Sequence, residues 1–186
     1  MRYSAEHKAQ TRDKLLASSA ALAKRGGFSA TGVDGLMKAI GLSGGAFYGH
    51  FASKDELFAA IVERELSHSV ALLGSAGSAA DKLQRCLDIY LNMQHVEHPD
   101  SGCALPTLGV EIARADHAVR ENAEHWLVRL QQAWGEVLDD PQLAWAILAQ
   151  CVGALLVARM LASPKRQEEV LASSRAMIAA SLTATD

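Results

Sequence analysis

The chain has 186 residues, of which 49% are hydrophobic, so it is long enough to bury a core and its composition excludes a disordered protein. The first 60 residues carry 8 Lys and Arg against 5 Asp and Glu, a net charge of +3, and the remainder carries 10 against 16, a net charge of −6. A basic end on an acidic body suits an anion-binding module attached to a second function, although ordinary surface variation produces such a sum as well.

The cysteines and the start of the chain indicate a cellular compartment. Cys86, Cys103 and Cys151 are odd in number and lack metal-ligand spacing. The chain does not open with the basic region, apolar region and cleavage site of a secretory signal peptide. We therefore expect a reduced, cytoplasmic protein.

The periodicity predicts an all-α fold. No run of alternating β-branched residues occurs, while Ala, Leu and charged residues recur every three to four positions. The first helix is expected over about residues 4–25, with Leu15, Ser19 and Leu22 on one face. A pair of glycines at 26 and 27 then ends it.

A short second helix is expected directly afterwards. Thr31 and Asp34 have the spacing of a capping box, in which each side chain bonds the backbone at the other residue. The helix they open ends near Ile40, and Gly41 supplies a turn at positive φ.

A third and a fourth helix follow the glycine turn. Ser43 is the expected N-cap of a short helix that reaches about Gly49. Ser53 and Glu56 form a further capping box, which opens a long helix ending near Leu73.

The second half of the chain is expected to be helical throughout, after a glycine and serine loop at 74–78. The predicted helices cover residues 79–96, 104–115, 117–138, 141–161 and 164–182.

The stretch 143–161 is almost entirely apolar, but it contains Gln150 and Arg159 and lacks the flanking residues of a membrane-spanning helix. We predict a buried helix and no membrane partner.

The two short helices joined through Gly41 have the form of a helix-turn-helix, with Leu36, Ile40, Leu42 and Phe47 as a small shared core. On geometry alone, a purely structural helical hairpin explains this pattern as well as a DNA-reading motif does.

The residues that follow decide between these interpretations. They read Phe47-Tyr48-x-His50-Phe51-x-Ser53-Lys54-Asp55-x-Leu57. Together with Arg12-x-x-Leu15-Leu16, Gly27-Phe28, Thr31 and Gly41-Leu42-Ser43, this string resembles the signature of the tetracycline-repressor (TetR) family of transcription regulators, over about residues 10–62. A looser likeness to one branch of the family continues through Gly102-Cys103, Leu105, Leu108 and Glu111.

The resemblance implies a fold and a function. The fold is an N-terminal three-helix DNA-binding domain, residues 1–52, followed by a C-terminal helical effector-binding and dimerisation domain, residues 53–186. The function is that of a repressor, not an enzyme, which binds a palindromic double-stranded DNA operator as a homodimer and is released by a small-molecule or electrophile effector. No cofactor is implied. The positions that match the family's DNA contacts are Thr31, Ser43, Gly44, Gly45, Ala46, Tyr48, His50 and Lys54.

The chemistry of these positions agrees with phosphate binding. Tyr48 and His50 are expected on one side of the short helix with donors for phosphate, and Lys54 is expected in the first turn of the next helix. Residues 44–46 are smaller than is common in the family, so the helix tip offers little side chain for base recognition. We expect these small residues to allow close approach to DNA instead.

A stripe of small residues predicts the dimer interface. Ala146, Ala149 and Gly153 lie on one face of a helix that is apolar on most sides, which suits close packing against a second copy. The alternative is that the core of the same chain covers this stripe.

An effector pocket is expected among the middle helices, which carry aromatic and Met residues with few polar partners. The candidates are Tyr90, Met93, Leu105, Leu108, Trp126, Leu130 and Trp134, with polar contacts from Gln94, Thr107 and Glu111. For each of them taken singly, core packing is the favoured explanation.

Cys103 stands near the start of a predicted helix, where the positive helix end lowers a thiol pKa and makes the thiol reactive toward oxidants or electrophiles. A single cysteine is more often a small buried apolar residue, and this interpretation is favoured over a sensor. His95 and His98, with Glu97, have metal-like spacing but lack a third ligand, so a solvated histidine pair is favoured over a metal site.

Two other function classes remain to be compared. A helical ligand-binding protein of the same fold without operator binding is the main alternative, and the joint presence of Tyr48, His50 and Lys54 argues against it. An enzyme is not favoured, because the spacing shows no Ser/His/Asp set, phosphate loop or metal cluster.

Overall fold

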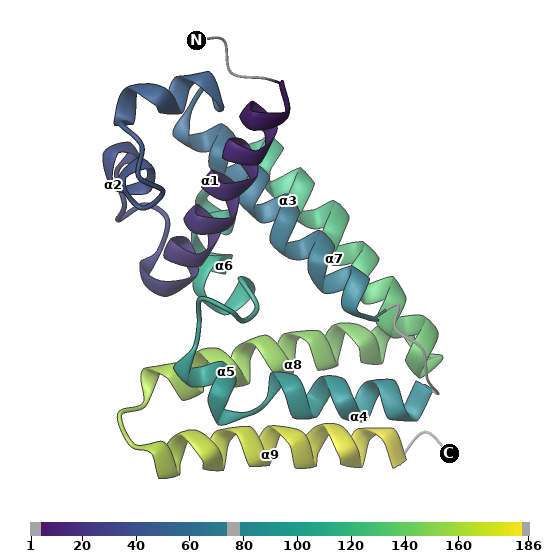
Figure 1. Cartoon of the computed structure of the whole chain (residues 1–186). Helices are drawn as coiled ribbons and strands as arrows, with labels where there is room; N and C mark the ends of the chain where they lie inside the picture. The colour runs from purple at the N-terminus through teal and green to yellow at the C-terminus, as the bar shows by residue number, and fades with distance from the viewer. Residues whose placement is uncertain (1–4, 74–78, 184–186) are drawn as a thin grey trace.

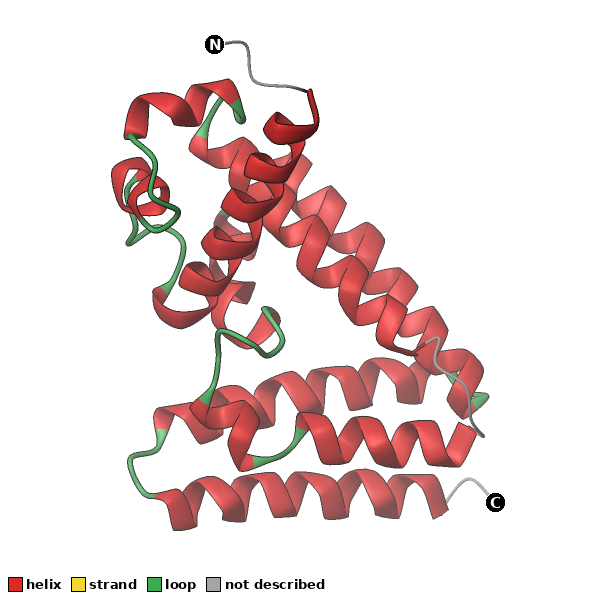
Figure 2. Cartoon of the chain, in the orientation of Figure 1, coloured by secondary structure: helices red, strands yellow, loops and turns green. Residues whose placement is uncertain are grey.

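The computed structural model describes residues 5–73 and 79–183, and within them every regular element is a helix, as predicted (Figures 1 and 2). The predicted loop at 74–78 and the first residue of the predicted N-terminal helix lie outside the described residues. The elements are α1 (Ala5–Gly26), α2 (Val33–Lys38), the 3₁₀ helix η1 (Gly44–Gly49), α3 (Lys54–Leu73), α4 (Ala79–Tyr90), α5 (Met93–Glu97), α6 (Leu105–Arg114), α7 (His117–Leu138), α8 (Pro141–Met160) and α9 (Pro164–Thr183).

The helices form a head and a body (Figure 1). The head, residues 5–52, comprises α1, α2 and η1 at one end of the molecule. From it, α3 and α7 run side by side to the opposite end, where α8, α9 and α4 are stacked. Helix α6 packs against α1 of the head and against α8 of the body, so it bridges the two regions.

Helix α1 ends as the sequence predicts. Leu15 and Ser19 are buried on its inner face, and Gly27 adopts a positive φ of 85° directly after the last helical residue. The Gly27 amide donates to the carbonyl of Ala23 at 2.8 Å, which closes the last turn.

The capping box predicted at Thr31 and Asp34 is wrong. Helix α2 begins at Val33, its N-cap is Gly32, and no side chain bonds the free amides there. The helix starts later than the pattern suggested, and the Asp34 carboxylate instead packs beside Gly44.

The third predicted helix forms, but as a 3₁₀ helix, and Ser43 flanks it without a side-chain hydrogen bond. Two consecutive glycines at its start weaken α-helical propensity, and short 3₁₀ turns tolerate such sequences.

The Ser53 half of the capping box that opens α3 is confirmed, while Glu56 reaches the residue before Ser53. The Glu56 amide donates to Ser53 Oγ at 3.0 Å, and the Ala52 amide donates to Glu56 Oε2 at 2.6 Å. This reciprocal pair fixes the direction in which the chain leaves the head and enters α3.

The prediction of one helix over 79–96 is wrong, because the chain breaks between α4 and α5 at Leu91 and Asn92. The Asn92 side chain bonds in both directions. Its Nδ2 donates to the carbonyls of Asp88 and Ile89, and its Oδ1 accepts from the backbone amide of His95 at 2.8 Å. A side chain that satisfies backbone groups of two helices at once ends one and starts the next.

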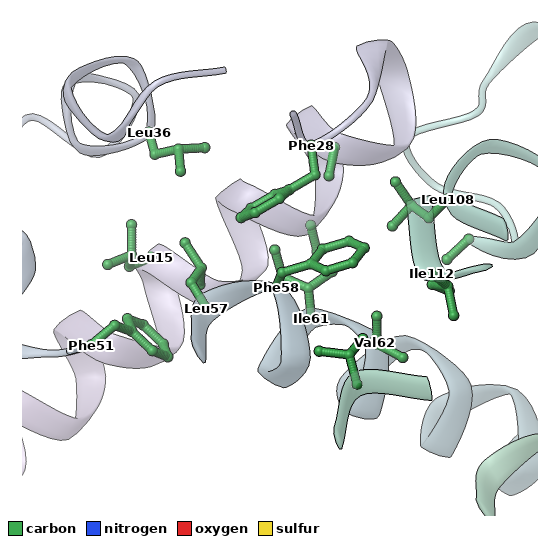
Figure 3. Packing of buried hydrophobic residues seen from close by; sticks show 14 of the residues in the cluster. Leu15, Phe28, Leu36, Phe51, Leu57, Phe58, Ile61, Val62, Leu108 and Ile112 are labelled. Carbon is green, nitrogen blue, oxygen red and sulfur yellow. The ribbon is translucent and has the colours of Figure 1, made fainter. Parts of the chain in front are cut away.

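One hydrophobic core joins the head to the body (Figure 3). Phe28, after α1, stacks on Phe58 of α3 with ring centroids 4.8 Å apart. Leu108 and Ile112 of α6 close the same core from the body side. Burial therefore continues across residue 52, so the packing does not mark an edge at the predicted domain boundary.

The small core predicted around the glycine turn forms only in part. Leu36 and Phe47 are buried and Ile40 packs against them, whereas Leu42 is 37% exposed. Met37, fully buried, occupies the inner position instead, because the turn carries Leu42 back toward the solvent side.

Helix α8 is long and apolar enough to cross a membrane by length and composition, but it packs between α7 and α9. The prediction of a buried helix holds for one side, which includes Ile147, Cys151 and Leu155. The other side is exposed: Leu156 and Met160 face outward.

Candidate nucleic-acid interface and effector region

The head has helix-turn-helix geometry. Gly41 takes a φ of 75° between α2 and η1, as predicted for the turn. The amide of Leu42 donates back to the carbonyl of Met37 at 3.0 Å, which fixes the angle between the two short helices. Phe47 anchors η1 by inserting into the head core.

Tyr48 and His50 differ in exposure, and only Tyr48 belongs to η1, because His50 is the C-cap residue that follows it. Tyr48 is 69% exposed, whereas His50 is partly buried and its Nδ1 atom has no hydrogen-bond partner within the described residues. Burial, together with the charges of Lys8 and Arg12, lowers the pKa of His50. With a φ of −120° and a ψ of −38°, the His50 backbone has left the 3₁₀ conformation, so the helical spacing that predicted a shared side does not apply to it. Of the two side chains, Tyr48 is the one that the head presents openly.

Lys54 occupies the first position of α3, as predicted, and its ammonium group is bonded to the head. Its Nζ donates to the carbonyl of Ser29 at 3.2 Å and lies 4.7 Å from the ring centroid of Phe28. The charge at Lys54 therefore has a fixed position at the surface of the head.

Thr31 is partly buried, and its methyl group packs beside Gly35.

The small residues at the tip of η1 are small for different reasons. A Cβ atom on Gly44 would lie 1.8 Å from Asp34 Oδ1, so the neighbouring carboxylate requires glycine or must move. Ala46 packs partly buried against the head core. Gly45 is exposed with open space beside it. Internal packing explains the first two, so Gly45 is the one of the three whose small size leaves free space in front of the tip.

Arg12 is a structural residue whose role the sequence did not single out. Its guanidinium donates to the carbonyl of His50 and lies over the ring of Phe51, 3.9 Å from the centroid. It ties α1 to the end of η1, so it positions the exposed Tyr48. The Arg12-x-x-Leu15 spacing in the motif was the available signal.

The sequence of this region has a family match. Residues 15–61 match the family of bacterial regulatory proteins described as the tetR family. The chain carries a TetR-family DNA-binding domain. The matched segment begins in α1 and ends in α3, so it contains the turn at Gly41 and the motif around Tyr48. No curated protein is significantly similar to the chain in sequence.

The TetR-type fold continues through the body. The crystal structure of reduced E. coli NemR is 24% identical in sequence to this chain and has a TM-score of 0.77. The alignment covers 91% of this chain and 95% of NemR. A TetR-family regulator from Cytophaga hutchinsonii is 20% identical, with coverages of 97% and 98% and a TM-score of 0.77. Another, from Chloroflexus aurantiacus, is 22% identical, with coverages of 94% and 96% and a TM-score of 0.76. The complete described chain thus has the fold of a TetR-type regulator.

The predicted pocket residues divide between two cores. Leu105, Leu108 and Trp126 belong to the core that joins the head to the body. Tyr90, Met93 and Trp134 pack on the second core, formed by α4, α5, α8 and α9. Leu130 is buried, and Gln94 is exposed. Among the candidates, Tyr90 and Cys103 lie together, with the hydroxyl beside the thiol.

The lowered pKa on which the sensor hypothesis for Cys103 depended is wrong, whereas the favoured interpretation of a buried residue agrees with the structure. Burial raises the pKa of this thiol, and it outweighs the opposing effects of the Tyr90 hydroxyl and the Leu105 amide. Helix α6 begins only at Leu105, and the side chain points into the body instead of toward solvent. Burial likewise raises the pKa of Cys151 to about 12. Neither thiol is activated in this conformation.

His95 is not the solvated residue that was expected. Its Nδ1 lies 2.8 Å from the carbonyl of Tyr90, and its Nε2 accepts from the Cys103 amide at 2.9 Å. Since Nε2 accepts, the proton of the neutral ring resides on Nδ1. Burial lowers the pKa of His95, and the charges of Arg159 and Lys24 add to this effect. No group of three His, Cys, Asp or Glu side chains suited to a metal occurs in residues 5–73 and 79–183.

Glu111 serves a different purpose from the predicted pocket contact. Its carboxylate accepts from the amides of Phe28 and Ser29, both at 2.8 Å, and from Ser29 Oγ at 2.6 Å. Helix α6 is thereby bonded directly to the turn that follows α1 in the head.

Two further contacts reinforce this junction. Lys24 of α1, only 7% exposed, pairs with Glu65 of α3 at 2.7 Å and donates to the carbonyl of Gly102 at 3.1 Å. Arg25 pairs with Asp100. We call the Glu111, Lys24 and Arg25 interactions together the head–body contact.

Proposed function

We propose that the protein is a cytoplasmic, dimeric transcription repressor that binds a palindromic operator and leaves it when a small molecule binds the body. The observation that carries this proposal is the helix-turn-helix, which presents Tyr48 openly beside the bare tip at Gly45. Recognition helices position themselves on DNA mainly through such phosphate contacts.

The exposed side of α8 supports pairing with a second copy of the chain. Ala146, Ala149, Gly153, Leu156 and Met160 recur at spacings of three and four, and all but the partly buried Gly153 are exposed. Small residues in such a stripe let two helices approach closely, and large apolar neighbours supply buried area. A two-fold dimer presents two heads to two half-sites.

The dimer has a sharp test, because a Cβ atom on Gly153 would meet open space within one chain. Gly153→Leu is expected to leave the monomer folded and to weaken dimerisation in sedimentation equilibrium. Gly109→Leu is the matched control, since Gly109 is also helical with open space beside it. A wild-type chain that sediments as a monomer at micromolar concentration would contradict the proposed dimer.

The operator is tested with DNA from upstream of the protein's own gene. Tyr48→Phe removes only the hydroxyl, so fluorescence anisotropy should show about tenfold weaker binding if that group bonds a phosphate. Val110→Ala replaces another exposed residue, on α6 of the body, and should bind as the wild type does. If the wild type binds this DNA no better than random DNA, the alternative of a ligand-binding protein without operator binding is preferred.

A further inference from the structure

Arg159, near the end of α8, is a partly buried cation that pairs with no carboxylate of residues 5–73 or 79–183. Its Nη2 donates to the carbonyl of His95 at 2.7 Å, and its Nη1 donates to Thr107 Oγ1 at 3.3 Å. Its Nε atom is buried and bonds nothing within the described residues. The guanidinium therefore has neutral partners, and its buried Nε–H is unused.

Other cations of the chain at comparable positions are paired. Arg175 also donates to a backbone carbonyl, that of Leu91, but its second nitrogen pairs with Glu168 at 2.7 Å. Lys24 is more deeply buried and pairs with Glu65. A cation removed from water normally has such a partner, because its desolvation is otherwise uncompensated. At Arg159 burial lowers the pKa of the guanidinium, as expected for a charge without a counter-ion.

A second unused donor lies in the same place. The Tyr90 hydroxyl is buried beside the Cys103 thiol, and no hydrogen bond of normal geometry satisfies it in the described part of the chain. Tyr90 and Cys103 are also the two groups that act electrostatically on Arg159. We call Tyr90, Cys103 and Arg159 the Arg159 cluster. It lies where α4, the segment before α6, and α8 meet.

We infer that the Arg159 cluster binds the carboxylate of a small organic anion, and that this anion is the effector, which rests on the proposed function. A carboxylate supplies the missing negative charge, and its oxygens accept from the unused Arg159 Nε and Tyr90 hydroxyl. The adjoining core of α4, α5 and α8 is apolar, including Met93 and Trp134, so it suits an apolar remainder on the ligand.

The position of the cluster connects it to the head. Cys103 follows Gly102, whose carbonyl accepts from Lys24 of α1. A Cβ atom on Gly102 would lie 2.1 Å from His95 Nε2, so this segment already fits tightly against the imidazole. A ligand that enters beside Cys103 therefore displaces the segment, and with it the hydrogen bond that holds α1. Binding in the body is thereby coupled to the orientation of the head.

The test measures binding to the full-length chain by calorimetry, with acetate, hexanoate and benzoate, their uncharged amides, and inorganic phosphate as probes. Hexanoate or benzoate is expected to bind at least about tenfold more tightly than its amide, because the amide lacks the charge. Arg159→Gln should weaken the carboxylate about 10- to 100-fold and Tyr90→Phe about 3- to 10-fold. Arg175→Gln is the matched control and should change the affinity less than about twofold, because its guanidinium already has a carboxylate partner.

Three results would overturn the inference. The first is that each acid and its amide bind equally tightly. The second is that Arg159→Gln and Tyr90→Phe both keep the wild-type affinity for the carboxylate while circular dichroism shows both variants folded. The third is that phosphate binds as tightly as the best carboxylate. Operator binding is measured separately without ligand, so its absence counts against the proposed function alone. A carboxylate that binds the cluster but leaves an operator complex intact would overturn the effector role.

Discussion

The head–body contact and the Arg159 cluster are two polar assemblies in one small helical protein, and they differ in how completely their groups are satisfied. In the first, the Lys24 ammonium has a carboxylate and a carbonyl, and the Glu111 carboxylate has three donors. In the second, Arg159 Nε and the Tyr90 hydroxyl have no such partner in the described residues. A satisfied assembly holds two regions in a fixed relation, whereas an unsatisfied one has capacity left for a ligand.

The largest effect is expected from breaking the buried pair of the head–body contact. Glu65→Leu leaves the Lys24 ammonium buried without its counter-ion, so the free energy of unfolding in urea should fall by about 3 kcal/mol. Adding Lys24→Met should restore most of this loss, because two apolar side chains then pack together. Arg25→Ala, which breaks a more exposed pair with Asp100, should cost less than about 1 kcal/mol. If Glu65→Leu costs no more than Arg25→Ala, the buried pair does not stabilise the junction.

A smaller effect is expected at Glu111, where charge and geometry are both used. Burial raises the pKa of this carboxyl, but hydrogen bonds from Ser29 and Phe28 outweigh it and hold the pKa below its ordinary value. Because the folded pKa is depressed, this stabilisation is present above the unfolded pKa, about 4.3, and is lost as pH falls through the folded value.

Glu111→Gln should therefore reduce stability at neutral pH by about 1–2 kcal/mol, since an amide offers one acceptor oxygen where the carboxylate offers two. It should also flatten the acid limb of the stability profile measured by urea unfolding between pH 3 and pH 6. Glu121→Gln, at an exposed site on α7, is the control. An acid limb identical to that of the wild type would show that Glu111 does not contribute as a carboxylate.

Most of the difference between the head–body contact and the Arg159 cluster could not be predicted from the sequence. Periodicity and caps predicted the helices well where a local signal decides, as at Ser53 and Glu56, and the motif around Tyr48 identified the DNA-binding domain. The same local rules failed at Thr31, where Asp34 packs beside Gly44 after the chain has turned back. They also failed at residues 79–96, where the local bonds of Asn92 to residues 88, 89 and 95 break the helix and the periodicity gave no sign of them.

The two polar assemblies are non-local, which explains why they were missed. Glu111 bonds residues 82 and 83 positions earlier in the chain, and Arg159 reaches His95 across 64 positions. Sequence marked Arg159 only as a charge in an apolar helix, and it marked Glu111 as a polar residue among pocket candidates. Neither observation specifies a partner, because side-chain contacts at such separations are set by tertiary packing.

The opposite response is expected at Arg159 in the absence of ligand. Arg159→Met removes two hydrogen bonds but also removes the unpaired charge, so the free energy of unfolding should change by less than about 1 kcal/mol in either direction. This contrasts with the loss of about 3 kcal/mol expected for Glu65→Leu. A loss at Arg159 as large as that would place the residue with the head–body contact, as a structural group, and would remove the contrast between the two assemblies.

The smallest effect is expected at His95, which touches both assemblies. Its ring accepts from the Cys103 amide and packs against Gly102, and Arg159, Lys24, Tyr90 and Cys103 are the titratable or charged groups that surround it. Protonation would place a donor against the Cys103 donor and a charge beside two cations.

Burial and these cations depress the folded pKa of His95, so the unfolded chain takes up the proton first. Stability from this group is therefore complete above the unfolded pKa, about 6.5, and declines as pH falls toward the folded value. His95→Gln keeps an acceptor for the Cys103 amide but removes the titration, so stability measured from pH 7 to pH 5 should decline less steeply than in the wild type. His125→Gln, an exposed residue on α7, should leave the slope unchanged. If the slope with His95→Gln equals that of the wild type, the imidazole does not join the two assemblies through its protonation state, and its role is confined to packing against Gly102.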